Sequence, residues 1–332
     1  MKDKKKVSSL LGKIVVITGA SSGIGKATAE AFAKEGANLV LASRGEEALT
    51  ATAEVCRRFG SVVLTLITDT SIPEDVYQLA EKAFALNNRI DYWINNAGVL
   101  SFGKLEETPI EVLDQIIKTN LLGYLHSAHA ILPVFKKQNK GVLINNISIG
   151  GWMPAPYGAA YTASKFGVRG MVETLQGEVS DYPDIHICAL YPGFQKSSGI
   201  EHAANYSGIK LSTPPPSFDP RDLANAIVNI AKNPVNSTYP DWFSVVAKNL
   251  YTFFPETIRT ASSSLMRLIM KKANHEENTE GNVLQPSKGN MGIHGKALLS
   301  SERTIKIASA GIVSLGIIIL LFLSKKGKLN ST

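Results

Sequence analysis

Tyr161 and Lys165 are the residues of this 332-residue chain whose types and spacing most directly suggest proton-transfer chemistry. They are four positions apart in "YTASK", so on a helix they lie on one face. A free tyrosine with a pKa of about 10 is only about 0.1% ionised at neutral pH, which makes it a poor base. A lysine ammonium about 4 Å away contributes about 4 kcal/mol at an effective dielectric of about 20, equivalent to about three pKa units. The pair therefore predicts a tyrosine that exchanges a proton near neutral pH, although such a pair alone is more often a surface contact.

A glycine-rich turn, "GASSGIG", follows the apolar run "KIVVIT" near the start of the chain. Gly19, Gly23 and Gly25 let the backbone turn tightly and approach a pyrophosphate, whose charge then meets free N–H groups at the positive end of a helix. Such a turn alone is weak evidence. Its position between a predicted strand and a predicted helix favours a dinucleotide-binding site.

Six apolar, β-rich runs alternate with helix-length segments and would position these residues. The runs cover residues 13–18, 38–43, 61–68, 90–98, 141–148 and 185–192. Helices are expected over 25–34 and over 73–86, where Pro73 suits a first helical position. Continuous apolar strands separated by helices predict a parallel sheet covered on both faces, which is an α/β, doubly wound, Rossmann-type fold in a single domain.

Taken together, the motifs resemble those of the short-chain dehydrogenase/reductase family. The family's order is matched by "TGASSGIG", "NNAG" at 95–98, Asn120, Ser148, "YTASK", and "PG" at Pro192 and Gly193. The resemblance covers about residues 10–233. It implies an enzyme that transfers a hydride between a nicotinamide cofactor and a carbonyl or secondary alcohol. The joint occurrence of the motifs outweighs the interpretation of Tyr161 and Lys165 as a surface pair.

The resemblance also implies roles for individual residues. Tyr161 would act as general acid or base on the substrate oxygen, and Ser148 would hydrogen-bond the same oxygen. Lys165 would also bind the nicotinamide ribose, and Asn120 would hold a proton-relay water. The predicted cofactor-binding residues are Gly19, Ser21, Ser22, Gly23, Ile24, Gly25, Arg44, Asp69, Thr70, Asn96, Ala97, Gly98, Tyr161, Lys165, Pro192 and Gly193. Where the family often has a threonine after "PG", this chain has Phe194, Gln195, Lys196 and Ser197, which leaves the contacts of that loop open.

The end of the second strand indicates the cofactor. An acid there would accept the adenine ribose hydroxyls, whereas an arginine can pair with a 2′-phosphate. This chain has Arg44 and no acid until Glu46, which favours NADP(H) over NAD(H); the alternative is that Arg44 is a solvated loop residue. Asp69, beside Thr70, resembles the family's adenine-contacting acid, with an ordinary turn cap as the alternative.

No metal site is predicted. His126 and His129 lie at helical spacing without a matching carboxylate, which favours a packed or surface pair. Cys56 and Cys188 match no metal-binding or redox spacing, and we expect no disulfide. Much of the formal net charge of +7 lies in "KDKKK" at the start and "KKGK" near the end, so it does not indicate a nucleic-acid groove.

The chain beyond the predicted sheet divides by composition. We expect a basic tail (1–9), a catalytic domain (10–240), an amphipathic helical extension (241–272), a flexible polar linker (273–302), a transmembrane helix (303–325) and a tail (326–332). Within the catalytic domain, the polar, proline-rich stretch 194–219 reads as a lid or as a merely solvated loop. Residues 307–323 are uncharged and long enough to span a membrane, with a buried or partner-binding helix as the alternative. No signal peptide is recognised at the N-terminus, so the catalytic part is expected to face the cytoplasm.

Two function classes remain open from sequence. The first is the NADP(H)-dependent oxidoreductase, for which a membrane anchor makes an apolar, lipid-like substrate more plausible. The second is a dinucleotide-binding sensor or scaffold at a membrane that no longer catalyses, against which the complete catalytic set argues. The resemblance further implies a homo-oligomer formed through the helices before and after the Ser148 strand.

Overall fold

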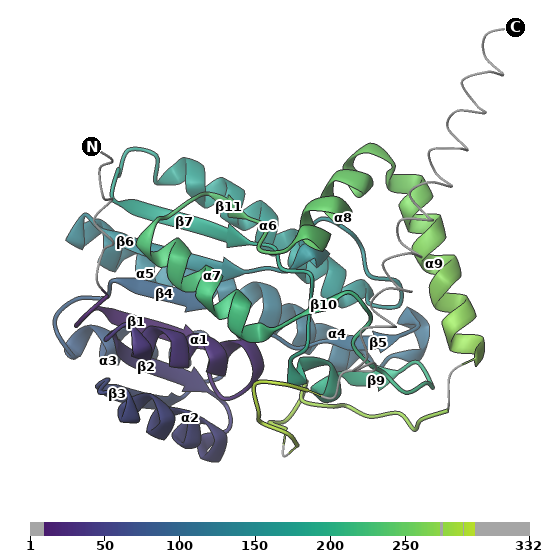
Figure 1. Cartoon of the computed structure of the whole chain (residues 1–332), viewed down its shortest axis with the longest axis horizontal. Coiled ribbons are helices and arrows are strands. Elements are labelled where there is room, and N and C mark those ends of the chain that lie inside the picture. The colour runs from purple at the N-terminus through teal and green to yellow at the C-terminus, as the bar shows by residue number, and fades with distance from the viewer. Residues whose placement is uncertain (1–9, 273–274, 288, 296–332) are drawn as a thin grey trace, which may run out of the picture.

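A seven-stranded sheet forms the centre of the computed structural model of the chain, which describes residues 10–272, 275–287 and 289–295 (Figure 1). The strand order is β11-β7-β6-β4-β1-β2-β3, and every neighbouring pair is parallel. The strands are β1 (Ile14–Thr18), β2 (Asn38–Ser43), β3 (Val63–Ile67), β4 (Tyr92–Asn95), β6 (Gly141–Asn146), β7 (Ile185–Leu190) and β11 (Ser237–Thr238). The six predicted strands are therefore confirmed. The edge strand β11 was not predicted, because two residues carry no periodicity.

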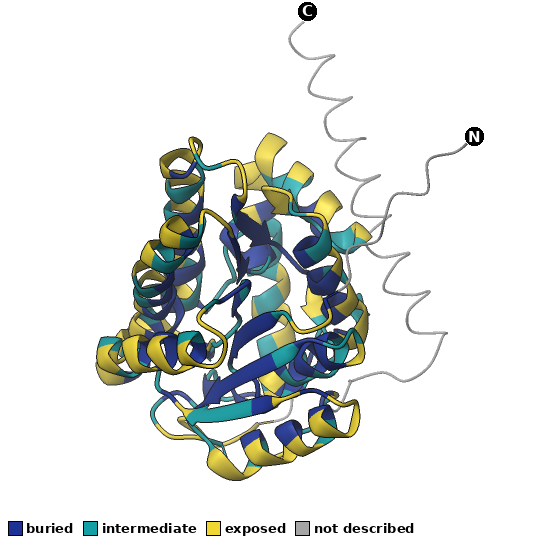
Figure 2. Ribbon diagram, turned by 90° about the vertical axis from the view of Figure 1, so that its left-hand side faces the viewer, coloured by how far each residue is buried: buried dark blue, intermediate teal, exposed yellow. Residues whose placement is uncertain are grey.

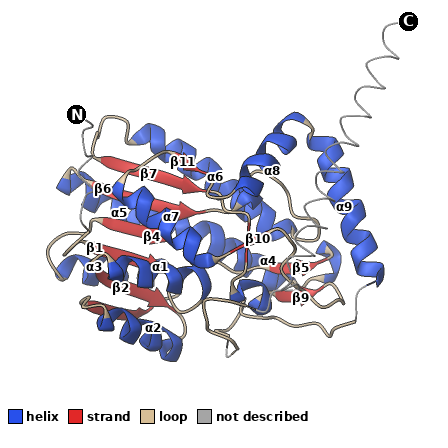
Figure 3. Cartoon of the chain, viewed as in Figure 1, coloured by secondary structure: helices blue, strands red, loops and turns tan. Residues whose placement is uncertain are grey.

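Helices cover both faces of the sheet, as expected for a doubly wound fold (Figure 3). One face is covered by α1 (Gly23–Lys34), α2 (Glu46–Arg58) and α7 (Pro220–Lys232), and the other by α3 (Pro73–Ala85), α5 (Gly123–Gln138) and α6 (Ala159–Glu178). The helix α4 (Ile110–Ile117) leads into α5 through the π-helical turn η2 (Lys118–Leu122). The sheet order reverses between β1 and β4, the place where doubly wound folds bind ligands at the carboxyl ends of their strands.

The core lies in two layers, one on each side of the sheet. Buried residues lie mainly on the strands and on the inward sides of the helices (Figure 2). All five residues of β1 are buried: Val15 and Ile17 point to the layer under α1 and α7, while Ile14 and Val16 point to the layer under α3 and α5. Burying each such side chain contributes about 1.5–3 kcal/mol. Burial on both faces explains why the strands appear in the sequence as uninterrupted apolar runs.

The stretch 194–219 is partly packed against the domain. It contains β8 (Phe194–Gln195), paired with β10 (Ser217–Phe218), the 3-10 helix η4 (Ser198–His202), and β9 (Ala204–Tyr206), paired with β5 (Ser101–Gly103). Ser198, His202 and Ala204 are buried. These contacts disagree with a merely solvated loop and place the segment beside the carboxyl edge of the sheet.

Two helices, α8 (Trp242–Phe253) and α9 (Pro255–Lys272), occupy the predicted amphipathic extension. The chain that follows differs from the expected linker, because residues 275–287 and 289–295 return to the domain and bury Val283 and Ile293. Val283 and Ile293 were not predicted to be buried, because the sequence around them is polar and has no period. Among the described helices, none is long and apolar enough to cross a membrane, and the predicted transmembrane helix 303–325 lies outside the described residues.

Candidate active site

The glycine turn connects β1 to α1 and lies at the point where the sheet order reverses. Gly19 has a φ of +66°, and a Cβ there would lie 2.8 Å from the Ala97 Cα. At Gly25 a Cβ would lie 2.0 Å from the carbonyl oxygen of Gly19, so helix and turn approach more closely than any side chain allows. The side chain of Ser22 at the N-cap makes no capping hydrogen bond. This close-packed backbone turn at the start of α1 fits a dinucleotide pyrophosphate, although one of its N–H groups, that of Gly23, donates to the Gly292 carbonyl oxygen at 3.0 Å.

The "NNAG" segment holds the glycine turn in place. The Asn96 amide nitrogen Nδ2 donates to the carbonyl oxygens of Thr18 and Gly19, at 3.1 and 3.3 Å. The hydroxyl of Thr18 accepts from the backbone N–H groups of Asn96 and Ala97, at 3.0 and 3.1 Å. Asn96 therefore holds the glycine turn in position. Thr18 holds the "NNAG" segment beside that turn, a role that sequence reasoning missed. Its position at the end of β1, directly before the first glycine, was the available signal.

Ser148 follows β6 in a strained backbone conformation. Its φ of 98° and ψ of 156° lie in a region that is otherwise almost restricted to glycine, at a cost of about 1–3 kcal/mol. The Ser148 Oγ accepts a hydrogen bond from the Gly150 N–H at 3.1 Å and is hydrogen-bonded to the Tyr161 side chain. The structure thus brings two of the predicted catalytic residues into direct contact, and the strain is of the kind that clusters at functional sites.

Lys165 is buried one helical turn after Tyr161 on α6, between two aromatic rings. Its Nζ lies 5.1 Å from the ring centroid of Tyr124 and 5.7 Å from that of Tyr161, and donates to the Asn146 carbonyl oxygen at 3.4 Å. Ring faces attract an ammonium at such distances. Burial nevertheless lowers the pKa of Lys165 to about 8. Sequence reasoning missed Tyr124 of α5 and Asn146 of β6, which contact Lys165 from other elements.

The pKa of Tyr161 differs from the sequence-based expectation. Burial raises the pKa of this phenol above its ordinary value, and the hydrogen bond with Ser148 offsets only part of that rise. The expected lowering by Lys165 is not among the causes of this shift, although the Lys165 Nζ lies 5.7 Å from the Tyr161 ring centroid. Tyr161 therefore holds its proton at neutral pH, which makes it an acid rather than a base in this structure.

Asn120 is fully buried in the π-helical turn between α4 and α5, a type of distortion that is frequent at functional sites. Its side-chain oxygen accepts from the Val99 N–H at 2.8 Å, and its Nδ2 donates to the Val99 carbonyl at 2.9 Å and to the Ser164 Oγ at 3.2 Å. The side chain thereby ties the helix to the loop after β4. Its predicted role toward a relay water stays a prediction.

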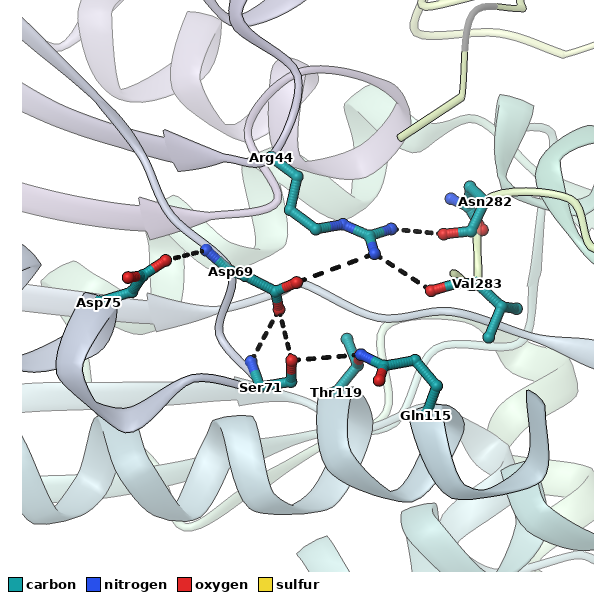
Figure 4. A network of polar contacts seen from close by, with 8 residues as sticks. All are labelled: Arg44, Asp69, Ser71, Asp75, Gln115, Thr119, Asn282 and Val283. Atoms are coloured by element: carbon teal, nitrogen blue, oxygen red, sulfur yellow. Dashed lines mark hydrogen bonds and ion pairs between the residues drawn. The ribbon is translucent and has the colours of Figure 1, made fainter. Parts of the chain in front are cut away.

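Arg44 and Asp69, at the ends of β2 and β3, face each other with 4.0 Å between the Nη1 nitrogen and the Oδ2 oxygen (Figure 4). Asp69 Oδ1 accepts from the backbone N–H and hydroxyl of Ser71, at 2.9 and 2.7 Å, which is the turn-cap arrangement given as the alternative. Its second oxygen remains directed toward Arg44. Thr70 packs beneath Gly123 of α5, where a Cβ would lie 2.9 Å from the Thr70 hydroxyl, and its predicted contact with the cofactor stays a prediction.

Pro192 and Gly193 follow β7 and border the same edge. The Pro192 carbonyl accepts from the Ile149 N–H at 2.9 Å, and the Gly193 N–H donates to the Asp241 carboxylate at 2.8 Å. Asp241 also caps α8 by accepting from the Ser244 N–H at 2.7 Å. The first of the two extension helices is therefore anchored at the rim of the site.

The two histidines weighed above as a metal site or a packed pair make separate contacts. His126 hydrogen-bonds the Thr70 carbonyl, and His129 hydrogen-bonds the Tyr77 hydroxyl. Within the described residues there is no group of three or more metal-ligating side chains that could hold an ion. Cys56 and Cys188 are buried and unpaired, and burial raises the pKa of each thiol to about 12.

Comparisons with known proteins identify the family of this chain. The profile of the short chain dehydrogenase family matches residues 13–206, more than half of the chain. Uncharacterized oxidoreductase YxnA of Bacillus subtilis (strain 168) is 30% identical over 284 residues, which cover 83% of this chain and 78% of that protein. Estradiol 17-beta-dehydrogenase 11 of Homo sapiens is 31% identical over 227 residues, covering 68% of this chain and 73% of that protein.

A solved structure extends the agreement to three dimensions. The alcohol dehydrogenase from the archaeon Thermococcus sibiricus, complexed with 5-hydroxy-NADP, is similar with a TM-score of 0.60 and 30% sequence identity. The similarity covers 68% of this chain and 95% of that one. The glycine turn, the sheet topology and these matches lead to one assignment: this chain belongs to the short-chain dehydrogenase/reductase family and is an NAD(P)-dependent oxidoreductase.

Proposed function

We propose that this protein is an NADP(H)-dependent reductase of carbonyl compounds, with Tyr161 as the general acid. The observation that carries the proposal is the contact between Ser148 and Tyr161, beside a buried Lys165 and at the same sheet edge as the glycine turn. A bound nicotinamide would supply or accept the hydride. Gly19, Gly25, Arg44 and Lys165 are the residues that would hold the cofactor.

The raised pKa of Tyr161 is the observation that leads us to propose the direction of reduction. Tyr161 keeps its proton at neutral pH because burial raises its pKa, so it can donate to a carbonyl oxygen. Ser148 holds its hydroxyl against the phenol and would hydrogen-bond the same oxygen. Lys165 places positive charge against the Tyr161 ring, which stabilises the tyrosinate left after the proton has been transferred.

Oxidation of NADPH by detergent-solubilised protein tests the proposed reaction directly. Fractionated lipid extracts and ketosteroids are the substrates to use, because a dehydrogenase of estradiol is among the relatives. Carbonyl-dependent loss of NADPH absorbance is the expected result. Measurable NADPH binding without turnover on any carbonyl would instead identify the sensor or scaffold described above.

The activity should fall in alkaline solution as Lys165 loses its charge. A lysine is charged below its pKa, and burial lowers the pKa of Lys165 to about 8. We therefore expect kcat/KM for carbonyl reduction to be level near pH 6–7 and to decrease as the pH rises through about 8. Measurement of kcat/KM from pH 6 to 10 checks this prediction. A decline that begins only near the ordinary lysine pKa would contradict it.

Arg44→Ser should weaken NADPH binding far more than NADH binding. An arginine that pairs with a 2′-phosphate contributes about 1.5–3 kcal/mol, so its loss corresponds to about a 10- to 150-fold increase in Kd. NADH lacks that phosphate, so its Kd should change by less than about twofold. Titration of nicotinamide fluorescence measures both constants. Equal losses for the two cofactors would contradict the assignment of Arg44.

We also propose that the protein is held at a membrane by residues 303–325, with its catalytic domain facing the cytoplasm and an apolar, lipid-like substrate. In support, α8 and α9 expose large apolar side chains next to basic residues, among them Phe253 at 73% and Leu268 at 56% exposure. Fractionation is the test. Release of the full-length chain from membranes by salt alone would contradict insertion.

A homo-oligomer is proposed through α5 and α6, as the family resemblance implies. In support, Leu125 and Phe166, on these two helices, are large apolar side chains that are exposed in the single chain. Sedimentation of the detergent-solubilised protein measures the oligomeric state, and a monomer would contradict the proposal.

A further inference from the structure

Residues 275–287 and 289–295, which we name the strap, run along the carboxyl edge of the sheet after α9 (Figure 1). Backbone hydrogen bonds attach the strap at both ends of its path. Asn205 and Thr279 exchange two such bonds, at 2.7 and 3.0 Å. Near the other end, the Gly23 N–H of the glycine turn donates to the Gly292 carbonyl at 3.0 Å. The strap therefore joins the segment 194–219 to the glycine turn.

Two buried apolar side chains anchor the strap. Val283 is fully buried in a cluster with Val99, Val112, Ile116, Ala160 and Ala204, against which Tyr161 also packs. Ile293 is buried against Ala27 of α1 and Ala224 of α7. Between these anchors, Pro286 lies against Gly45, the residue after Arg44, at 3.8 Å from an ideal Cβ built there. The strap thus passes over the residues that follow β2.

The carbonyl groups of the strap hold the guanidinium of Arg44 (Figure 4). Nη1 donates to the Val283 carbonyl oxygen at 3.1 Å, and Nη2 donates to the Asn282 carbonyl oxygen. The Arg44 side chain is still 19% exposed. A guanidinium has five N–H donors in one plane, so two carbonyl contacts orient that plane and leave three donors. The carbonyl groups are neutral and do not cancel the positive charge of Arg44, whereas the Asp69 carboxylate, with its Oδ2 4.0 Å from Nη1, would share the guanidinium with a bound phosphate.

We propose that the strap is the outer wall of the adenosine half of the cofactor site and that it positions Arg44 for the 2′-phosphate of NADP(H). This inference rests on the proposed function, because Arg44 selects the phosphate only if the cofactor binds at this edge. Discrimination between NADP(H) and NAD(H) then depends on Val283, a residue 239 positions from Arg44 that anchors the two carbonyl groups. The opposite arrangement, in which the strap carbonyls compete with the phosphate for Arg44, predicts effects of the opposite sign.

Val283→Asp in the full-length protein tests the proposal, because a carboxylate cannot stay in the apolar cluster and the strap must leave. Nicotinamide fluorescence titrations should show a Kd for NADPH raised by about tenfold, equivalent to about one lost charged hydrogen bond, and a Kd for NADH changed by less than about twofold. Val62→Asp, at an exposed valine, is the matched control and should change neither constant. Val283→Ala should act in the same direction but more weakly, and it provides the test if the aspartate variant does not fold.

Two further measurements test whether the strap positions Arg44 for the phosphate or competes with the phosphate for it. In the Arg44→Ser background, Val283→Asp should have no additional effect on the Kd for NADPH. Addition of NADPH to the wild-type protein should slow amide hydrogen exchange in residues 275–295. The proposal would be overturned if Val283→Asp bound NADPH more tightly, left the Kd for NADPH unchanged, or raised the Kd values for NADPH and NADH equally. Faster or unchanged amide exchange in the strap on adding NADPH would also overturn it. Wild-type protein that binds neither dinucleotide would overturn the proposed function instead.

Discussion

Tyr161→Phe is expected to abolish carbonyl reduction while leaving NADPH binding nearly unchanged. Phenylalanine preserves the ring that lies under the Lys165 ammonium, 5.7 Å from the ring centroid, but it has no proton to donate. Loss of a general acid lowers turnover by about 10²- to 10⁴-fold. Ser148 keeps its hydrogen bond from the Gly150 N–H, so the strained turn retains a partner. Stopped-flow or steady-state NADPH oxidation measures turnover, and fluorescence titration measures the NADPH Kd.

The matched control is Tyr77→Phe, which removes an exposed hydroxyl on α3 that hydrogen-bonds His129. It should leave both turnover and NADPH binding unchanged. Full activity of Tyr161→Phe would refute the catalytic role. If Tyr161→Phe instead lost NADPH binding in proportion to activity, its hydroxyl would be a cofactor contact rather than the proton donor.

Gly25→Ala is expected to have the second largest effect, because it adds a Cβ 2.0 Å from the Gly19 carbonyl oxygen. The Cβ would also lie 2.7 Å from the Asn96 Nδ2, but the closest contact is with the Gly19 backbone, so movement of a side chain alone cannot relieve it. Overpacking of this kind costs about 1–3 kcal/mol, and the turn must open to accommodate it. We expect a lower unfolding temperature and loss of measurable binding for both NADPH and NADH.

Gly170→Ala is the control, because the same methyl group added within α6 would contact nothing within 4 Å. Alanine should stabilise the helix there by about 0.5–1 kcal/mol relative to glycine. Cofactor titrations and thermal unfolding of the two variants form one experiment. Unchanged NADPH binding by Gly25→Ala would show that the turn does not hold the cofactor.

Much of the fold followed from local pattern. The six main strands were predicted because burial on both faces leaves uninterrupted apolar runs, as in β1. The start of α3 at Pro73 followed from the preference of proline for a first helical turn. The edge strand β11 escaped prediction because two residues, Ser237 and Thr238, pair with β7 without any period of their own.

The candidate catalytic residues could also be named from the sequence, since their identities, order and spacing are properties of the chain itself. Ser148 and Tyr161 were expected to act on one oxygen, and the structure brings their side chains into a hydrogen bond. The residues that contact Lys165 were not predictable in the same way. Tyr124 and Asn146 contact Lys165 from other elements, and their positions along the chain carry no mark of that contact.

The sequence by itself determined the Rossmann-type alternation, the glycine turn and the set of groups available for proton transfer. Only the tertiary structure decided how those groups are charged, because burial sets the pKa of Tyr161 and Lys165, and burial depends on the whole fold. It also decided that a polar segment near the C-terminus packs over Arg44. That contact joins Arg44 and Val283, which are 239 positions apart, whereas hydrophobic periodicity relates only residues a few positions apart. The sequence pattern therefore could not predict it.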